Sequence, residues 1–144
     1  MFMNDEIIVF TNGCFDLLHD GHMYLLNECS ELGDKLVVGI NSDESVKRLK
    51  GDSRPIQSEN ERKNNLLALD IVDEVIIFED DTPYNTIKEL NPDILIKGGD
   101  YELHEVVGVD IVEEVIIIPL LDGYSTTKLI EKGKADGNTC TRKP

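Results

Sequence analysis

The chain of 144 residues contains no tryptophan, only 3 cysteines and few basic residues. Its 14 Lys and Arg stand against 29 Asp and Glu, so the formal net charge is −15. A general nucleic-acid binder needs a basic face, and so does a protein that docks on anionic lipid; the charge therefore argues against both partners. Three cysteines without a C-x-x-C pair indicate neither a disulfide framework nor a zinc ribbon.

The N-terminal region lacks a long hydrophobic run. Its longest apolar stretch, residues 7–10, is too short for a signal peptide or a membrane span. Together with the cysteine usage, this favours a cytoplasmic protein. Hydrophobic residues still make up 40% of the chain, which is too much for a disordered acidic protein. The length suits one domain, which we expect over residues 1–133, with a polar tail over 134–144.

Five short runs rich in Ile and Val do not alternate with polar residues, which is typical of parallel strands buried on both faces. The runs are 7–10, 36–40, 75–78, 94–96 and 115–118. Helical patterns occupy 23–32, 42–50, 58–69, 82–90 and 125–132, and the third of these is expected to pack through Leu66, Leu67 and Leu69. This alternation predicts an α/β fold: a Rossmann-like open parallel sheet of about five strands with helices on both faces.

Glycines and polar residues follow each expected strand, and the carboxyl ends of parallel strands share one edge of the sheet. Ligands of open α/β sheets bind at this edge. The segment 13–22 carries the strongest signal, because His19 and His22 flank Gly21 at an expected helix N-terminus. Free backbone N–H groups there favour a phosphate, and imidazoles add further donors. Such a pair taken alone is more often one loop histidine and one capping histidine, but its position after a strand favours the phosphate site.

Three weaker signals lie elsewhere. Residues 125–127 open the last expected helix with hydroxyls, which suit a phosphate or an ordinary N-cap about equally. Residues 97–100 combine a lysine with two glycines, which suits a ligand contact or a plain turn. A cationic stretch over 47–54 continues with Arg62 and Lys63; such runs are usually solvated helix faces. We expect the stretch 47–54, Lys97, the two histidines and the helix N-termini to make a local positive site. The acids of 70–122 are expected to lie mostly on the solvated body.

Together these segments resemble the cytidylyltransferase-like nucleotidyltransferases, and most closely the D-glycero-β-D-manno-heptose 1-phosphate adenylyltransferase domain of ADP-heptose synthases. The resemblance covers about residues 7–132 and rests on TNGCFDLLHDGH at 11–22, KGGDY at 97–101 and GYSTT at 123–127, with further matches at 41–55 and 80–83. It implies a nucleotidyltransferase domain over 1–133 that transfers AMP from ATP to a sugar 1-phosphate and releases pyrophosphate. It also implies Mg²⁺ with ATP, a homodimer, and a separate sugar kinase upstream.

The resemblance assigns roles to particular positions. Residues expected to be catalytic are His19, His22 and Lys50. Residues expected to bind the nucleotide are Thr11, Asn12, Gly13, Cys14, Phe15, His19, Gly21, His22, Lys97, Gly99, Asp100, Ser125, Thr126 and Thr127. Residues expected to bind the acceptor substrate are Asp16, Asn41, Asp43, Lys50 and Arg54. No direct protein ligand to a metal is expected, and Cys14 is expected to be a small packing side chain and not a nucleophile.

Two departures from the family pattern weaken the hypothesis that the nucleotide is CTP and leave the sugar undecided. Cytidylyltransferase relatives carry an arginine before the final motif, whereas residues 119–122 contain no cation. The stretch between Tyr101 and Gly123 is a few residues shorter than the family pattern. One alternative is a cytidylyltransferase that acts on glycerol 3-phosphate or another polyol phosphate. The other is a non-catalytic nucleotide-binding module.

Overall fold

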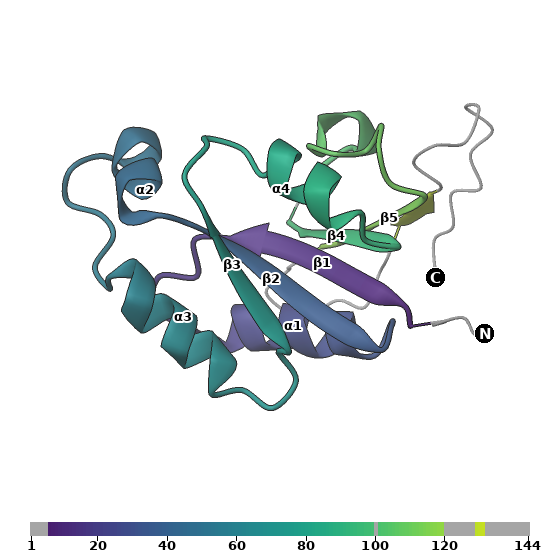
Figure 1. The fold of residues 1–144 in the computed structure, drawn as a ribbon, viewed down its shortest axis with the longest axis horizontal. Coiled ribbons are helices and arrows are strands. Elements are labelled where there is room, and N and C mark those ends of the chain that lie inside the picture. Colours follow the sequence, from purple (N-terminus) through teal and green to yellow (C-terminus); the bar gives the residue numbers. More distant parts are fainter. Residues whose placement is uncertain (1–5, 100, 120–128, 132–144) are drawn as a thin grey trace.

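A computed structural model of the chain describes residues 6–99 and 101–119 and the backbone of 129–131. Its strands are β1 (Ile8–Gly13), β2 (Lys35–Asn41), β3 (Glu74–Phe78), β4 (Ile94–Gly98), β5 (Glu114–Ile118) and β6 (Leu129–Glu131). Its helices are α1 (Asp20–Ser30), α2 (Asp43–Lys50), α3 (Glu59–Leu67), α4 (Tyr84–Leu90) and the 3₁₀ helix η1 (Leu103–Glu105). The elements surround one central sheet (Figure 1).

The sheet has six strands in the order β3-β2-β1-β4-β5-β6. The pairings among β1 to β5 are all parallel, which confirms the predicted Rossmann-like sheet. The chain builds outward from β1 through β2 to β3, then crosses back and continues through β4 to β5. The strand order therefore reverses between β1 and β4, and open α/β sheets bind ligands in the crevice at such a reversal.

The expected last helix is wrong over Leu129–Glu131. These residues form β6, which pairs antiparallel with β5 in the register Val115↔Glu131 and Ile117↔Leu129. A Leu-Ile pair within a short segment fits the spacing of apolar residues in a helix as well as in a strand. The local sequence therefore did not decide between helix and strand. The open backbone of β5 decides it, because an unpaired strand edge gains hydrogen bonds from any segment laid beside it. The rest of that expected helix lies outside the described residues.

Apolar layers cover both faces of the sheet. On one face α1 and α3 pack against the strands, and on the other face lie α4 and the segment around η1 (Figure 1). On α1, the buried residues are Leu25, Leu26 and Cys29. In α3, Leu66 is fully buried, but Leu67 is 40% exposed, so the prediction that Leu67 packs inward was wrong. Consecutive residues of a helix lie on different faces, and the face that carries Leu66 packs against the sheet.

Helix boundaries follow their capping residues. Ser58 and Glu61 form a capping box at the start of α3, and Ser42 caps α2. The first helix begins at Asp20, three residues earlier than its apolar pattern indicates, because His19 caps it. Pro83 is the N-cap of α4, which therefore begins at Tyr84, two residues after the expected start at 82.

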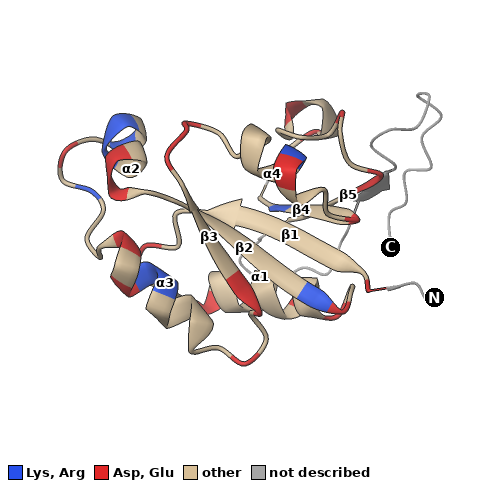
Figure 2. Ribbon diagram, viewed as in Figure 1, with Lys and Arg blue, Asp and Glu red and all other residues tan. Residues whose placement is uncertain are grey.

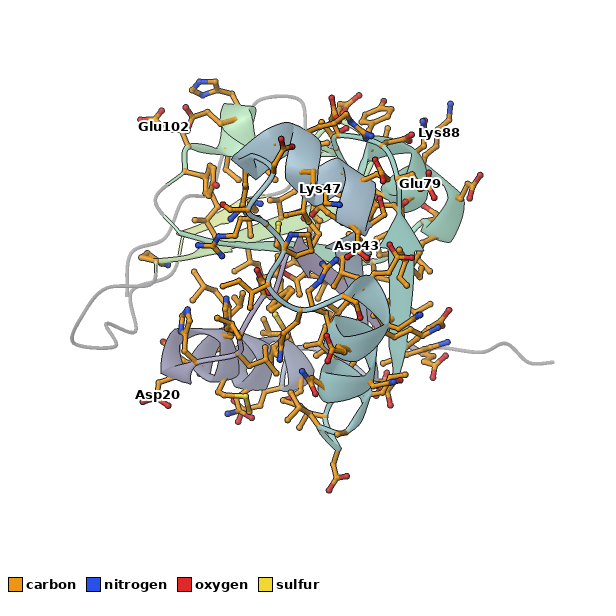
Figure 3. All side chains as sticks on the ribbon, turned by 90° about the vertical axis from the view of Figure 1, so that its left-hand side faces the viewer. Asp20, Asp43, Lys47, Glu79, Lys88 and Glu102 are labelled. Carbon is orange, nitrogen blue, oxygen red and sulfur yellow. The ribbon has the colours of Figure 1, made fainter. Side chains whose placement is uncertain are left out.

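Charged residues fall mainly on the helices and loops around the sheet (Figure 2). The described acids of 70–122 are exposed, apart from the half-buried Glu114, as expected. Figure 3 shows the side chains of Asp20, Lys88 and Glu102 at the periphery. Among the described residues, Arg62 is the one charged residue that is buried. In the same part of the chain, we find no helix with the length and apolar character that crossing a membrane requires.

Candidate active site

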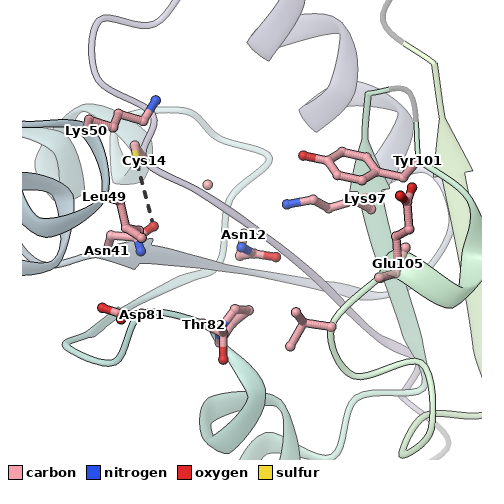
Figure 4. A pocket seen from close by; sticks show the side chains of 14 residues that line it. Asn12, Cys14, Asn41, Leu49, Lys50, Asp81, Thr82, Lys97, Tyr101 and Glu105 are labelled. Atoms are coloured by element: carbon pink, nitrogen blue, oxygen red, sulfur yellow. Dashed lines mark hydrogen bonds between the residues drawn. The ribbon is translucent and has the colours of Figure 1, made fainter.

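A pocket of about 440 Å³ opens at the carboxyl ends of β1, β2 and β4, beside the point where the strand order reverses (Figure 4). This is the edge at which the sequence predicts a ligand site. Its lining comes from these strands, from α2, from the β3–α4 loop and from the segment after β4. The lining residues are Asn12, Gly13, Cys14, Asn41, Leu49, Lys50, Asp81, Thr82, Pro83, Lys97, Tyr101, Glu105, Val106 and Val107.

His19 and His22 form an interlocked pair at the start of α1. The backbone N–H of Gly21 donates to Nδ1 of His19 at 3.0 Å, and the backbone N–H of His19 donates to Nδ1 of His22 at 3.2 Å. Since both Nδ1 atoms accept, the N–H of each ring is on Nε2. A Cβ at Gly21 would lie only 3.0 Å from Cε1 of His19, so the glycine keeps room for that ring.

The charge state of His22 follows from its surroundings. Burial, reinforced by the charges of His19 and Lys50, lowers the pKa of His22 to about 4 from its ordinary 6.5. Its ring also packs against Phe15, with centroids 5.1 Å apart. At neutral pH His22 is therefore an uncharged donor through Nε2–H, which suits a hydrogen bond to a phosphoryl oxygen.

The histidine pair and the pocket lie on two sides of the sheet edge. Along β1 and β4 the side chains alternate, and Phe10 and Leu95 belong to the apolar layer beneath α4. By the same alternation Asn12 and Lys97 point to the α4 side, whereas α1 packs on the opposite face. The turn after β1, with Gly13 and Cys14, joins the two sides.

Asp16 holds the loop that follows α2. Its carboxylate accepts from the backbone N–H groups of Ile56 at 2.8 Å and Gln57 at 2.9 Å, and from the Arg54 guanidinium at 3.2 Å. Burial opposes the charge, but these donors together hold the pKa of the Asp16 carboxyl below its ordinary value. Two of the predicted substrate-binding residues, Asp16 and Arg54, are thus bound to each other, and contact of either with substrate stays a prediction.

Arg62 bonds to several parts of the site, whereas the sequence pattern suggested a solvated helix face for it. Its side chain is fully buried. It donates to Oδ1 of Asp43 at 2.8 Å, to the carbonyl of Asn41 at 2.8 Å and to the carbonyl of Cys14 at 3.0 Å. One signal was available in the sequence: Arg62 precedes the core residue Leu66 by four positions and so shares its helix face.

The other predicted cations divide into paired and unpaired side chains. Arg48 makes an ion pair with Asp81 at 2.9 Å and also donates to the carbonyl of Glu79. Of the lysines and arginines in the predicted cationic stretch over 47–54, only Lys50 lines the pocket. The positive site is therefore narrower than the sequence suggests: Lys50 and Lys97 face a pocket that also contains carboxylates.

Several residues expected to bind the nucleotide or substrate have structural partners. The Thr11 hydroxyl is buried and donates to the carbonyl of Ile96 at 2.8 Å, so it joins β1 to β4. The Asn41 amide donates to Oγ of Ser45 at 3.0 Å, and the Cys14 thiol donates to Oδ1 of Asn41 at 3.7 Å. This contact fits the packing role expected of Cys14. Asp100, Ser125, Thr126 and Thr127 lie outside the described residues.

Comparison with known proteins is consistent with this geometry. The family model described as Cytidylyltransferase-like matches residues 10–132. The chain is 58% identical over 125 residues to the bifunctional protein HldE of a Nitratiruptor species, covering 87% of this chain and 27% of that protein. It is 52% identical over 136 residues to the bifunctional protein HldE of Helicobacter pylori (strain P12), covering 94% of this chain and 30% of that protein. The chain thus spans less than a third of the length of these curated relatives.

A solved structure shares the fold along nearly its whole length. The crystal structure of the lipopolysaccharide core biosynthesis protein from Thermoplasma volcanium GSS1 superposes with a TM-score of 0.69 at 32% identity. The match covers 81% of this chain and 99% of that one. With the family model matching most of the chain and the sheet order described above, the protein belongs to the cytidylyltransferase-like family of nucleotidyltransferases.

Proposed function

We propose that this enzyme transfers AMP from ATP to a sugar 1-phosphate, D-glycero-β-D-manno-heptose 1-phosphate, and releases pyrophosphate. The observation that carries the proposal is the pair of Nε2–H donors on His19 and His22, set at a helix N-terminus beside a pocket with two lysines. The choice of sugar rests on the resemblance to the adenylyltransferase domain of ADP-heptose synthases and on the similarity to the bifunctional HldE proteins.

In the proposed reaction, a phosphate oxygen of the acceptor attacks the α-phosphorus of ATP. A new oxygen–phosphorus bond forms while the bond from the α-phosphorus to the bridging oxygen breaks, and pyrophosphate leaves with that electron pair. The attacking phosphate is already an anion, so the enzyme needs to position the reactants and stabilise charge. His19 and His22 donate to the phosphoryl oxygens of the transition state, and Lys50 neutralises phosphate charge.

A divalent cation accompanies the nucleotide in enzymes of this family, and we propose Mg²⁺. Within the described ranges, no three His, Cys, Asp or Glu side chains are grouped so as to hold a metal ion. Mg²⁺ binds preferentially through phosphate oxygens and water, with only one or two carboxylates from the protein. A Mg²⁺ ion that arrives bound to ATP therefore does not require a larger group of protein ligands. Bound to the phosphates of ATP, the cation would neutralise triphosphate charge.

We further propose a cytoplasmic homodimer supplied with substrate by a separate sugar kinase.

Pyrophosphate release tests this function. The enzyme is incubated with Mg²⁺ and either ATP or CTP, together with heptose 1-phosphate, other sugar 1-phosphates or glycerol 3-phosphate, and mass spectrometry identifies the products. We expect ADP-heptose from ATP and heptose 1-phosphate. Release from CTP and glycerol 3-phosphate alone would favour a cytidylyltransferase. Tight nucleotide binding with no pyrophosphate from any pair would indicate a non-catalytic module.

A further inference from the structure

Lys97 is a half-buried ammonium group without an anionic partner. It lies near the end of β4, and within the described ranges it makes neither an ion pair nor a hydrogen bond. Burial lowers the pKa of Lys97, and only the nearby Cys14 opposes that shift. An unpaired charge withdrawn from water is unfavourable, so a ligand that supplies a negative charge here would gain affinity.

The side chain is held in a defined direction. Its Nζ lies 5.1 Å from the centroid of the Tyr101 ring, in a cation–π contact. Gly99, with a φ of +122°, turns the chain so that Tyr101 returns over Lys97. A Cβ at Gly99 would lie 3.0 Å from the Tyr101 ring, so the turn is closely packed. Figure 4 shows the ammonium pointing from β4 into the pocket, toward Asn12.

The two lysines of the pocket, Lys50 and Lys97, lie on opposite walls and have different neighbours. The charge of Lys50 acts on His22, whereas Lys97 lies within electrostatic range of Cys14 and approaches from the other wall of the pocket (Figure 4). The pocket carboxylates have partners of their own: Asp81 pairs with Arg48, and an oxygen of Glu105 accepts from the backbone N–H of Glu102 at 2.9 Å. Among the residues that the structure describes, Lys97 is therefore the cation that remains available to an anion on the side of the pocket away from α2.

We propose that Lys97 binds the phosphate of the acceptor and not the nucleotide, and so selects acceptors that carry an anion. This inference rests on the proposed function and changes one expectation from the sequence, which placed Lys97 among the nucleotide contacts. The reason is its direction: Lys97 and Asn12 point to the α4 side of the sheet, opposite the face on which α1 packs. An acceptor phosphate on Lys97 would approach the α-phosphorus from the pocket while ATP lies against the histidine pair.

Steady-state kinetics with Lys97→Met test the proposal, because methionine keeps the length and the packing but not the charge. We expect the KM for heptose 1-phosphate to rise about 10- to 100-fold, in line with the loss of one charged hydrogen bond. The KM for ATP should change less than about twofold. Lys97→Arg should recover most of the acceptor affinity, and Lys88→Met, at an exposed position on α4, should match the wild type. A rise in the KM for ATP with an unchanged acceptor KM would overturn the proposal.

A second measurement needs neither turnover nor a variant. Lysines of the wild-type enzyme are acetylated briefly with a limiting reagent, and mass spectrometry measures the modified fraction of Lys97. We expect heptose 1-phosphate to protect Lys97, whereas ATP alone and the uncharged free heptose should not. Protection by ATP alone would overturn the proposal. If no acceptor yields pyrophosphate, the proposed function fails, and the protection experiment still decides separately whether Lys97 binds the sugar phosphate.

Discussion

The imidazole rings of His19 and His22 stack with their centroids 3.8 Å apart and their planes inclined by 28°. Each ring uses Nδ1 as an acceptor for a backbone N–H of the same turn. The two Nε2–H groups therefore remain as donors in a fixed arrangement. Because backbone hydrogen bonds fix both rings, the two donors need no rearrangement when negative charge develops on the phosphoryl oxygens. Hydrogen-bond donors accelerate a reaction most when they are preorganised in this way.

His22→Ala should lower kcat by about 10²- to 10³-fold, because one preorganised donor to the transition state is lost. ATP binding should weaken less, since α1 and its backbone N–H groups remain. Pyrophosphate release gives kcat, and calorimetric titration gives the Kd for ATP. The circular dichroism spectrum controls for the loss of the hydrogen bond from the His19 backbone N–H to His22. A variant with near-normal kcat would end the proposed role of His22.

His22 should also make stability depend on pH. Its pKa is about 4 in the folded protein, below the ordinary 6.5. Between these values the unfolded chain binds more protons, so this contribution is complete above pH 6.5 and is lost as pH falls toward 4. Urea midpoints at about pH 7 and about pH 4.5 should therefore differ more for the wild type than for His22→Gln. Equal differences in the two proteins would contradict the assigned protonation state.

Asp16→Asn should destabilise the fold by about 1–3 kcal/mol, because the amide cannot accept from Ile56, Gln57 and Arg54 together. Lys50 precedes the loop that Asp16 holds, so we also expect kcat to fall. Urea denaturation gives the free energy of unfolding, and pyrophosphate release gives kcat. The control is Asp52→Asn, an exposed carboxylate in the same loop, which should leave both unchanged. Unchanged stability in Asp16→Asn would show that these contacts contribute little.

Arg62→Met should destabilise the protein by about 3–5 kcal/mol, because it leaves a carboxylate and buried carbonyls without their donor. The Asp43 carboxylate and the carbonyls of Cys14 and Asn41 lose a partner at once. Urea unfolding measures the change. Lys63→Met, one position along α3, should shift stability by less than about 0.5 kcal/mol. Equal stability of the two variants would show that Arg62 is dispensable.

Much of the fold could be predicted from local pattern. Uninterrupted apolar runs indicate strands covered on both faces, and the helices between them require parallel crossovers. The prediction failed at Leu129–Glu131, where pairing with β5 outweighs a short helical pattern. At the site, the glycines and histidines of the first turn were recognisable because their chemistry lies within a few consecutive residues.

The sequence by itself determined the order of the strands β1 to β5 with the helices α1 to α4, the edge of the sheet at which the pocket opens, and the histidine pair, since each depends on spacing along the chain. Only the tertiary structure decided which charges are free. Arg62 and Lys50 belong to one cationic region, yet Arg62 is buried against Asp43 while Lys50 lines the pocket. The direction of Lys97 was likewise decided by its strand and by Tyr101. A charged side chain takes its role from neighbours that folding brings from distant positions, and local sequence does not encode that choice.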